Sequence, residues 1–193
     1  MAKGEETRQA ILLRAFELAN VVGVSGLSIG RLAEATGLSK SGLFAHFGSK
    51  EALEVAVVEE ASRQFVQEVM VPALREPRGE PRVKAMFDRW VVWGARPGGC
   101  FFVGASAELD DRPGPPRDAL VQAIRDWTDA LSTAARIAIS ERHFRSDLDP
   151  EQFAFEMYGI MVGGHTYQRF LNEPDATKRM RAAFERLLRA SKG

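Results

Sequence analysis

Residues 36–53, TGLSKSGLFAHFGSKEAL, hold the side chains best suited to contacting a nucleic acid. After a glycine stop they present, in order, Ser39, Lys40, Ser41 and Gly42. Ser39 is a favourable N-cap, and the free N–H groups and partial positive charge of the helix that it begins suit a phosphate. Within a helix Gly42 costs about 1 kcal/mol relative to alanine, which indicates a need for close approach. Lys50, in the first turn of the next helix, opposes the helix dipole and better suits a phosphate contact.

Charge is distributed in a way that permits local but not general binding of polyanions. The chain has 193 residues, with 26 Lys and Arg against 26 Asp and Glu, so its formal net charge is zero. This balance excludes a uniformly basic nucleic-acid binder, although a locally basic surface remains compatible with it. Residues 35–50 contain no acidic side chain. The hydrophobic fraction of 45% and the charged fraction of 27% are ordinary for a globular chain.

Cysteine, histidine and apolar content limit the other classes of function. Cys100 is the only cysteine, so no intrachain disulfide can form, which fits a reducing cytoplasm. Its neighbours Phe101 and Phe102 and the lack of a resolving cysteine favour a buried residue over a redox sensor. The three histidines are far apart in sequence, so we expect no metal, and no cofactor motif is present. No signal core and no apolar run of roughly 18 residues occur, so we expect a cytoplasmic protein without a membrane partner.

Helical periodicity dominates the chain, and no alternating strand pattern is convincing. Glycine stops at Gly23, Gly37 and Gly48, serine caps at Ser28, Ser39 and Ser49, and prolines later in the chain separate the predicted helices. We therefore predict an all-α fold of about nine helices, with Pro72 marking the frayed end of the fourth. Two of these helices, near residues 29–36 and 40–47, are too short to be stable alone and must be packed by neighbours. Two short helices joined by a glycine turn and braced by a first helix form the helix-turn-helix pattern, although such pairs also occur in other helical domains.

Residues 7–53 resemble the DNA-binding domain of the TetR family of bacterial transcriptional regulators. The stretch has the family's order of motifs, from Thr7-Arg8 through Gly37-Leu38-Ser39 to the closing His46-Phe47 and Lys50-Glu51. The resemblance implies a DNA-binding domain over residues 1–53, with a helix-turn-helix at about 27–46. The positions that it places at the DNA are Ser28 and Arg31 beside the groove, Ser39, Lys40, Ser41 and Gly42 in it, and Phe44, His46 and Lys50 near the backbone. The family usually has tyrosine where this chain has Phe44, which lacks a hydroxyl for a phosphate.

In this family the remainder, here residues 54–193, forms a larger helical bundle that binds a small effector and makes the homodimer. Aromatic and soft side chains are concentrated there, and as a group they predict an apolar pocket for a largely apolar effector, with Tyr158 and His165 as polar groups. The predicted lining is Trp90, Trp93, Phe101, Phe102, Trp127, Tyr158, Met161 and His165. Simple core packing is the alternative for each of them.

The last two predicted helices carry the expected dimer contact. Glycines in mid-helix are costly unless two backbones approach closely, as they do where helices cross at a two-fold axis. The predicted contact residues are Gly163, Gly164, Tyr167, Met180, Phe184 and Leu187. Contacts within one chain are the alternative explanation for the same pattern.

These features favour a ligand-responsive, DNA-binding transcriptional regulator, and we expect it to act as a repressor. It would bind a pseudo-palindromic operator as a homodimer and be released by a small-molecule effector. A helical small-molecule-binding protein without operator binding is the alternative. An enzyme built on the bundle is a third class, but no catalytic motif supports it.

Overall fold

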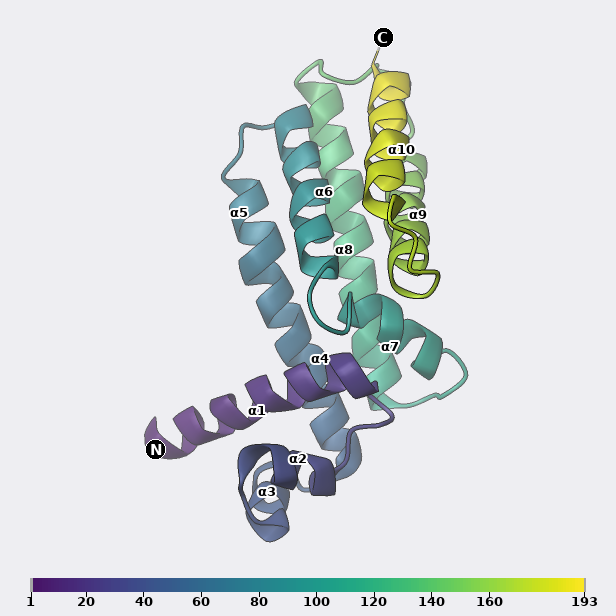
Figure 1. Cartoon of the computed structure of the whole chain (residues 1–193). Helices are drawn as coiled ribbons and strands as arrows, with labels where there is room; N and C mark the ends of the chain where they lie inside the picture. The colour runs from purple at the N-terminus through teal and green to yellow at the C-terminus, as the bar shows by residue number, and fades with distance from the viewer. Residues whose placement is uncertain (1, 193) are drawn as a thin grey trace. The chain divides into compact units, whose positions relative to one another are not determined.

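The computed structural model describes the backbone of residues 2–192 and the side chains of residues 6–192. Within that range the chain is all-α, as predicted, with no strand and with nine continuous helical segments (Figure 1). The helices are α1 (Ala2–Val22), α2 (Ile29–Thr36), α3 (Lys40–Phe47), α4 (Lys50–Phe65), η1 (Val66–Met70), α5 (Val71–Leu74), α6 (Glu80–Gly94), α7 (Phe101–Leu109), α8 (Pro115–Ser140), α9 (Pro150–Arg169) and α10 (Ala176–Ser191). None of the helices in the described part of the chain has the length and apolarity to cross a bilayer.

The fourth helical segment is the one whose end differs from the prediction. The sequence predicts that this helix runs to about Met70 and frays at Pro72, but the segment continues through Pro72 to Leu74. Before the proline the chain adopts a π-helical turn, in which the N–H of Val71 donates to the carbonyl of Val66. Proline lacks the N–H that an α-helix would use at this position. The wider π turn changes the hydrogen-bond register just ahead of it, so the helix passes the proline instead of ending there.

Packing divides the chain into two compact units. The first comprises residues up to Gln64 together with Pro97–Ala123, and the second comprises Phe65–Arg96 together with the chain from Ile124 onwards. By packing, most of α4 and all of α7 therefore belong with the three N-terminal helices. The predicted domain division after Leu53 stays a prediction.

The core of the first unit holds the two short helices in place. Leu27, Leu32, Leu43 and Leu53 are each fully buried, so one leucine comes from α2, one from α3, and one from each flanking segment. Figure 1 shows α2 and α3 next to each other, close to α1. Because neither short helix is stable by itself, this shared core is what fixes the orientation of α3.

The second unit is built on the antiparallel pair α9 and α10, which pack closely along their length (Figure 1). Phe87 of α6 stacks on Phe184 of α10, with ring centroids 3.9 Å apart. Gly164 of α9 faces Met180 of α10, and a Cβ built at Gly164 would lie 2.3 Å from the Met180 sulfur. The glycine therefore allows α9 and α10 of one chain to approach closely.

A buried carboxylate joins α1 to α4 in the first unit. Glu60 is 3% exposed, and it accepts hydrogen bonds from Gln9 at 2.9 Å, from Gln64 at 2.8 Å and from two nitrogens of Arg63. Burial raises the pKa of Glu60, but the hydrogen bonds from Arg63, Gln64 and Gln9 and the charge of Arg63 outweigh it, so the pKa lies below 4.5. A carboxylate that accepts several hydrogen bonds is stabilised in its charged form.

Replacing this carboxylate by an amide should change how stability depends on pH. Folded Glu60 holds its proton less tightly than the unfolded chain does, so it stabilises the fold above pH 4.5. That contribution is lost as the pH falls through the lowered pKa. We expect Glu60→Gln to be less stable than the wild type at pH 7 and to lose less stability between pH 6 and about pH 3. Urea denaturation at several pH values measures this, and parallel curves for the two proteins would contradict it.

Candidate nucleic-acid interface

Helix α3 begins with Ser39 as its N-cap. Gly37 ends α2 in the left-handed conformation, with φ of 70°, and its N–H donates to the carbonyl of Ala33. Ser39 then adopts an extended conformation, and its Oγ accepts a hydrogen bond from the N–H of Gly42 at 3.1 Å. The cap satisfies one of the free N–H groups of the helix start and leaves others available to a ligand.

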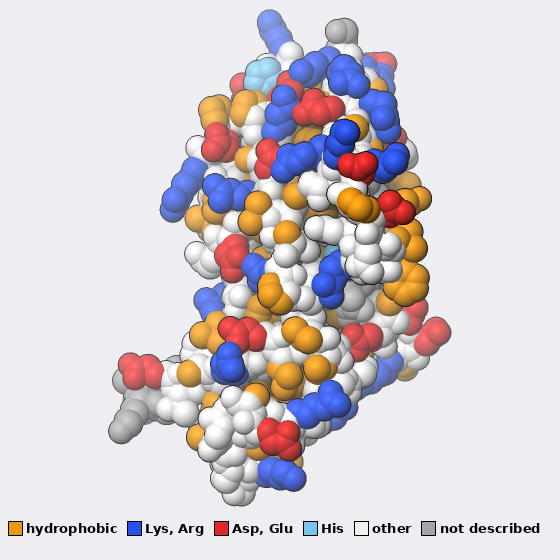
Figure 2. Space-filling view, viewed as in Figure 1, with side chains coloured by type: hydrophobic (Ala, Val, Ile, Leu, Met, Phe, Trp, Pro, Cys, Tyr) orange, Lys and Arg blue, Asp and Glu red, His pale blue; other side chains and the backbone are white. Residues whose placement is uncertain are grey.

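The faces of α3 differ sharply in burial. Leu43 and Phe47 are buried on the inner face, while Ser39, Lys40, Ser41 and Gly42 are all exposed. In Figure 2 the surface of α2 and α3 is mostly white, the colour of uncharged polar side chains and backbone, with few charged groups. The helix therefore presents a small, polar and acid-free N-terminal edge, which is what major-groove or phosphate contact requires.

Nothing in the part of the chain that the structure describes requires a glycine at position 42. A Cβ built there would meet one atom, the Oγ of Ser39, at 3.1 Å, and it would otherwise face open space. The glycine is thus not explained by internal packing or by an unusual backbone conformation. Its cost within the helix therefore still calls for an external reason, such as close approach of DNA.

The other residues predicted at the DNA lie around this edge. Ser28 caps α2, with its Oγ accepting from the N–H of Arg31 at 3.2 Å, and the Arg31 side chain reaches the carbonyl of Gly26 at 3.4 Å. Phe44 is 55% exposed, so its ring is free to contact a partner. His46 is partly buried beside Phe47, with ring centroids 6.3 Å apart. Their assignment to DNA remains a prediction.

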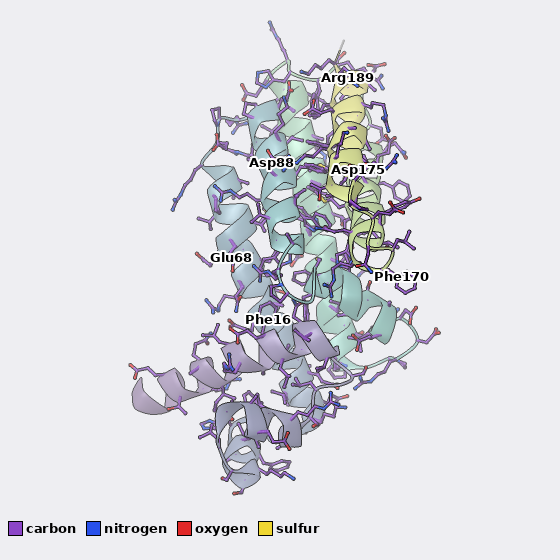
Figure 3. The ribbon with its side chains drawn as sticks, viewed as in Figure 1. Phe16, Glu68, Asp88, Phe170, Asp175 and Arg189 are labelled. Atoms are coloured by element: carbon purple, nitrogen blue, oxygen red, sulfur yellow. The ribbon has the colours of Figure 1, made fainter. Side chains whose placement is uncertain are left out.

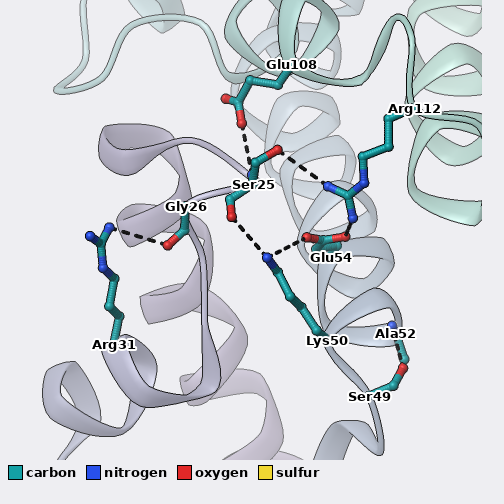
Figure 4. A network of polar contacts seen from close by, with 9 residues as sticks. All are labelled: Ser25, Gly26, Arg31, Ser49, Lys50, Ala52, Glu54, Glu108 and Arg112. Carbon is teal, nitrogen blue, oxygen red and sulfur yellow. Dashed lines mark hydrogen bonds and ion pairs between the residues drawn. The ribbon is translucent and has the colours of Figure 1, made fainter.

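Lys50 has partners within the chain that the prediction did not include. Its Nζ donates to the carbonyl of Ser25 at 3.0 Å and lies 3.6 Å from the Oε1 of Glu54 (Figure 4). Arg112, which follows α7, binds the same Glu54 carboxylate. Sequence reasoning missed Arg112 because no motif links it to Glu54 and Ser25, which are 58 and 87 positions away. Glu54 follows Lys50 by four residues, a spacing that pairs side chains on one helix face, so this partner could have been found from the sequence.

The residues predicted for the effector pocket are mostly packed in the cores. In the second unit Phe65 contacts the rings of Trp93 and Trp127 edge to face, at centroid distances of 5.3 and 4.9 Å. Trp90 and Met161 are buried, and Tyr158 and His165 are partly buried. Phe101 and Phe102 belong to the first unit, where Phe101 contacts Phe16 at 5.7 Å. Buried Cys100 precedes them, in agreement with the reading that the sequence favoured.

Two of these side chains carry polar atoms with distinct environments. The indole Nε1 of Trp127 is buried and has no hydrogen-bond partner among the described residues. Burial, and then the positive charge of Arg169, lower the pKa of His165 below 6.5, so its neutral form is favoured. The Trp127 indole and the His165 imidazole could therefore serve as the few polar groups of an otherwise apolar site. Their assignment to an effector pocket stays a prediction.

A groove in the second unit involves residues that sequence reasoning did not select. It has a volume of about 280 Å³. Its lining combines Met70, Leu74, Arg82, Met86, Asp126, Asp129, Ala130, Thr133, Ala134 and Ile137. The Nε of Arg82 is buried and has no hydrogen-bond partner in the part of the chain that the structure describes. The groove thus combines apolar walls with an arginine and two carboxylates.

The predicted dimer residues divide into two groups. Met180, Phe184 and Leu187 are buried against their own chain, and Gly164 contacts Met180. Gly163 is exposed, and a Cβ there would meet nothing within 4 Å, while Tyr167 is 51% exposed. The exposed side of α9 also carries two phenylalanines that the prediction did not include. These are Phe155, 73% exposed, and Phe170, 82% exposed, which projects from the end of the helix (Figure 3).

Two family models cover most of the chain. Residues 11–57 match the model described as bacterial regulatory proteins, tetR family. Residues 79–184, more than half of the chain, match the model described as tetracyclin repressor-like, C-terminal domain. The first match contains the capped α2–α3 pair and Lys50, and the second contains the part of the groove from Arg82 onwards, all of α9 and the first part of α10. No curated protein matches the chain by sequence at a significant level.

Solved structures resemble the chain over almost its whole length. A TetR transcriptional regulator from Chloroflexus aurantiacus is 28% identical, with a TM-score of 0.86 over 97% of this chain and 95% of that one. A TetR-family regulator from Cytophaga hutchinsonii is 24% identical, with a TM-score of 0.88 over 100% and 98%. AibR, solved in complex with isovaleryl coenzyme A and operator DNA, is 23% identical, with a TM-score of 0.68 over 82% and 85%.

Proposed function

Because the chain belongs to the TetR family of bacterial transcriptional regulators, we propose that it is a repressor. It binds a pseudo-palindromic operator as a homodimer in the cytoplasm, and a small molecule releases it. Members of this family are DNA-binding regulators with a ligand-binding C-terminal domain, and not enzymes.

The observation that carries operator binding is the N-terminal edge of α3. Ser39, Lys40, Ser41 and Gly42 are exposed on a helix that Leu43 and Phe47 anchor in the core. The anchored face fixes the angle of the helix, and the exposed edge offers N–H groups, hydroxyls and one ammonium group to phosphates and base edges. Two such edges, one from each subunit, would read half-sites about one helical turn apart.

The exposed side of α9 supports a homodimer. Phe155, Gly159, Gly163 and Phe170 recur at intervals of four and seven residues, so they lie on one side of the helix. Two phenylalanines left mostly exposed on a helix are costly in water, and the two glycines between them allow a second helix to approach closely. A second α9 related by a two-fold axis would cover both features.

For the effector we favour the groove beside the π-helical turn. Its apolar walls suit the body of a small molecule, and the buried, unsatisfied Nε of Arg82 suits an anionic or carbonyl group. Met70, the last residue of the π turn, is part of the lining. The complex of AibR with isovaleryl coenzyme A and operator DNA is compatible with an effector that combines acyl and charged groups. The aromatic residues predicted from sequence remain a second proposed site.

Selection from random DNA duplexes tests this function directly. The full-length protein should enrich an inverted repeat with two half-sites about one helical turn apart, centre to centre. Metabolite mixtures are then screened against the enriched duplex. A compound that acts as the effector should release the DNA and raise the melting temperature of the free protein.

Two outcomes would contradict the proposal in different ways. Enrichment of no sequence, together with stabilisation by a small molecule, would favour the alternative of a helical ligand-binding protein without operator binding. Enrichment of a single, non-repeated half-site would retain DNA binding but contradict the homodimer.

A further inference from the structure

The ammonium group of Lys50 is held by the chain and is still accessible. One of its N–H groups donates to the carbonyl of Ser25, and the group also faces the Oε1 of Glu54. An ammonium group has three N–H donors, and the 3.6 Å approach to Glu54 is an ion pair and not a hydrogen bond, so donors remain for a ligand. The Lys50 side chain is 49% exposed, which leaves the ammonium group open to solvent. Lys50 is therefore fixed in position before any phosphate arrives.

Arg112 contacts both residues that hold Lys50 (Figure 4). Its Nη2 donates to the Oε2 of Glu54 at 2.5 Å, and its Nη1 donates to the Oγ of Ser25 at 3.4 Å. The guanidinium group is planar and presents its donors in a fixed fork, so the two contacts set the distance between the two acceptors of Lys50.

Glu108 also holds Ser25 in place, through a hydrogen bond from the Ser25 backbone. The Oε2 of Glu108 accepts the N–H of Ser25 at 2.9 Å. Gly23 makes room for this carboxylate, because a Cβ at Gly23 would lie 2.5 Å from the Glu108 Oε1, and its φ of 84° also favours glycine. The loop between α1 and α2 is thus shaped to receive the Glu108 carboxylate, and it presents the Ser25 carbonyl toward Lys50.

Charge explains why Arg112 matters for Lys50. Glu54 is fully buried, and a buried carboxylate requires a positive partner. With Arg112 present, the two oxygens of Glu54 face two different cations, so Lys50 shares the carboxylate and retains part of its attraction for other anions. Without Arg112, Lys50 would be the one cation left at this carboxylate among the described residues, and it would be drawn inward.

We infer that Arg112 is a positioning residue for phosphate binding by Lys50, which it controls through Glu54 and Ser25. This inference rests on the proposed operator binding. Arg112 neutralises Glu54 and holds the loop, and the Lys50 ammonium then presents its free N–H group to a DNA phosphate. Arg112 lies just before α8. A shift of that helix would therefore move the Arg112 guanidinium away from Glu54 and weaken phosphate binding by Lys50.

The salt dependence of operator binding tests the inference, because each lost phosphate contact lowers the slope of log K against log salt by about one unit. The duplex is the inverted repeat selected with the wild-type protein. The variants are Lys50→Ala, Arg112→Gln and the double variant. Arg117→Gln is the matched control, since Arg117 lies nearby and donates to the carbonyl of Asp110 outside this cluster.

Each single variant at Lys50 and Arg112 should lower the slope by about one unit, and the double variant should also lower it by about one unit rather than two. Arg117→Gln should leave the slope unchanged. Arg112→Lys keeps a positive charge beside Glu54, so it should restore most of the slope. It also gives a readout if Arg112→Gln does not fold.

Three results would overturn the inference. A loss of two units in the double variant would mean that Arg112 contacts a phosphate itself. An unchanged slope in Arg112→Gln, with a lower melting temperature, would mean that the ion pair only stabilises the fold. If Arg112→Lys does not recover the slope, a positive charge beside Glu54 is not what controls phosphate binding by Lys50. If the wild-type protein selects no DNA at all, the proposed function itself is wrong, and the phosphate role of Lys50 fails with it.

Discussion

Gly42→Glu should abolish specific operator binding without loss of the fold. The glutamate adds bulk and a negative charge at the exposed start of α3, where the proposed interface meets phosphates and base edges. We expect the affinity for the selected operator to fall by about 100-fold or more, equal to about 2.8 kcal/mol. Fluorescence anisotropy at a fixed salt concentration measures this loss.

The same substitution should leave the stability of the protein equal or higher. Glutamate at position 42 follows the Ser39 cap by three residues, which creates a capping box, and it replaces a residue that is unfavourable in helices. A Cβ there has one close neighbour, the Ser39 Oγ at 3.1 Å, which offsets part of the gain. We expect a gain of up to about 1 kcal/mol, or a melting temperature about 2–4 °C higher.

The matched control is Gly104→Glu, which makes the same chemical change at an exposed glycine of α7. A Cβ at Gly104 meets nothing within 4 Å, so the side chain fits there as well. This variant should retain operator affinity within a few fold, since exposed charges are screened beyond about 10 Å. Equal losses in the two variants would attribute the effect to net charge and would remove α3 from the interface. Normal binding by Gly42→Glu would do the same.

Gly163→Glu should convert the dimer into a folded monomer. Gly163 is exposed in the single chain and has open space around its Cβ position, so a glutamate fits the monomer. In the proposed dimer the same position lies where two α9 helices cross, and a buried carboxylate without a partner would be strongly unfavourable. Light scattering at micromolar concentration should report the monomer mass, and operator affinity should fall by about 100-fold because the two half-sites are no longer bound together.

The adjacent glycine provides the contrast. Gly164→Ala places a Cβ 2.3 Å from the sulfur and 2.9 Å from the Cγ of Met180 within the same chain. Overpacking of this kind costs about 1–3 kcal/mol, which the better helix propensity of alanine offsets in part. We expect Gly164→Ala to lower the free energy of unfolding and to leave the mass in solution that of a dimer. A dimeric Gly163→Glu protein, or a monomeric Gly164→Ala protein of normal stability, would place the dimer contact elsewhere.

Local sequence signals were enough to locate the short helices of the first unit. Ser28 and Ser39 cap their helices with side-chain hydrogen bonds, and Gly37 and Gly48 end them at positive φ, all at the positions that the sequence predicts. Capping and glycine stops act over three or four residues, so they are readable without knowledge of the rest of the chain. The absence of acidic residues in α3 is likewise a property of a few consecutive positions, so the sequence alone shows it.

Signals of longer range were ambiguous in the sequence. The sequence gives no reason to distinguish Gly163 from Gly164. In the structure Gly163 faces open space, while Gly164 faces Met180 of α10. Similarly, the pattern of α10 suggested a dimer stripe, yet Met180, Phe184 and Leu187 are already buried within their own chain. An apolar stripe predicts that a helix face is covered, and it does not identify what covers it.

By itself the sequence determined the all-α class, the capped helix-turn-helix and the edge of α3 that suits DNA, since propensity, capping and periodicity are local properties of the chain. Tertiary structure alone brought Ser25 and Arg112, from two other segments, to Lys50 and Glu54 of α4 (Figure 4). It also decided that the chain passes Pro72 through a π-helical turn. The physical reason is that a buried charge selects its partners by proximity in space, and that proximity exists only after the helices have packed.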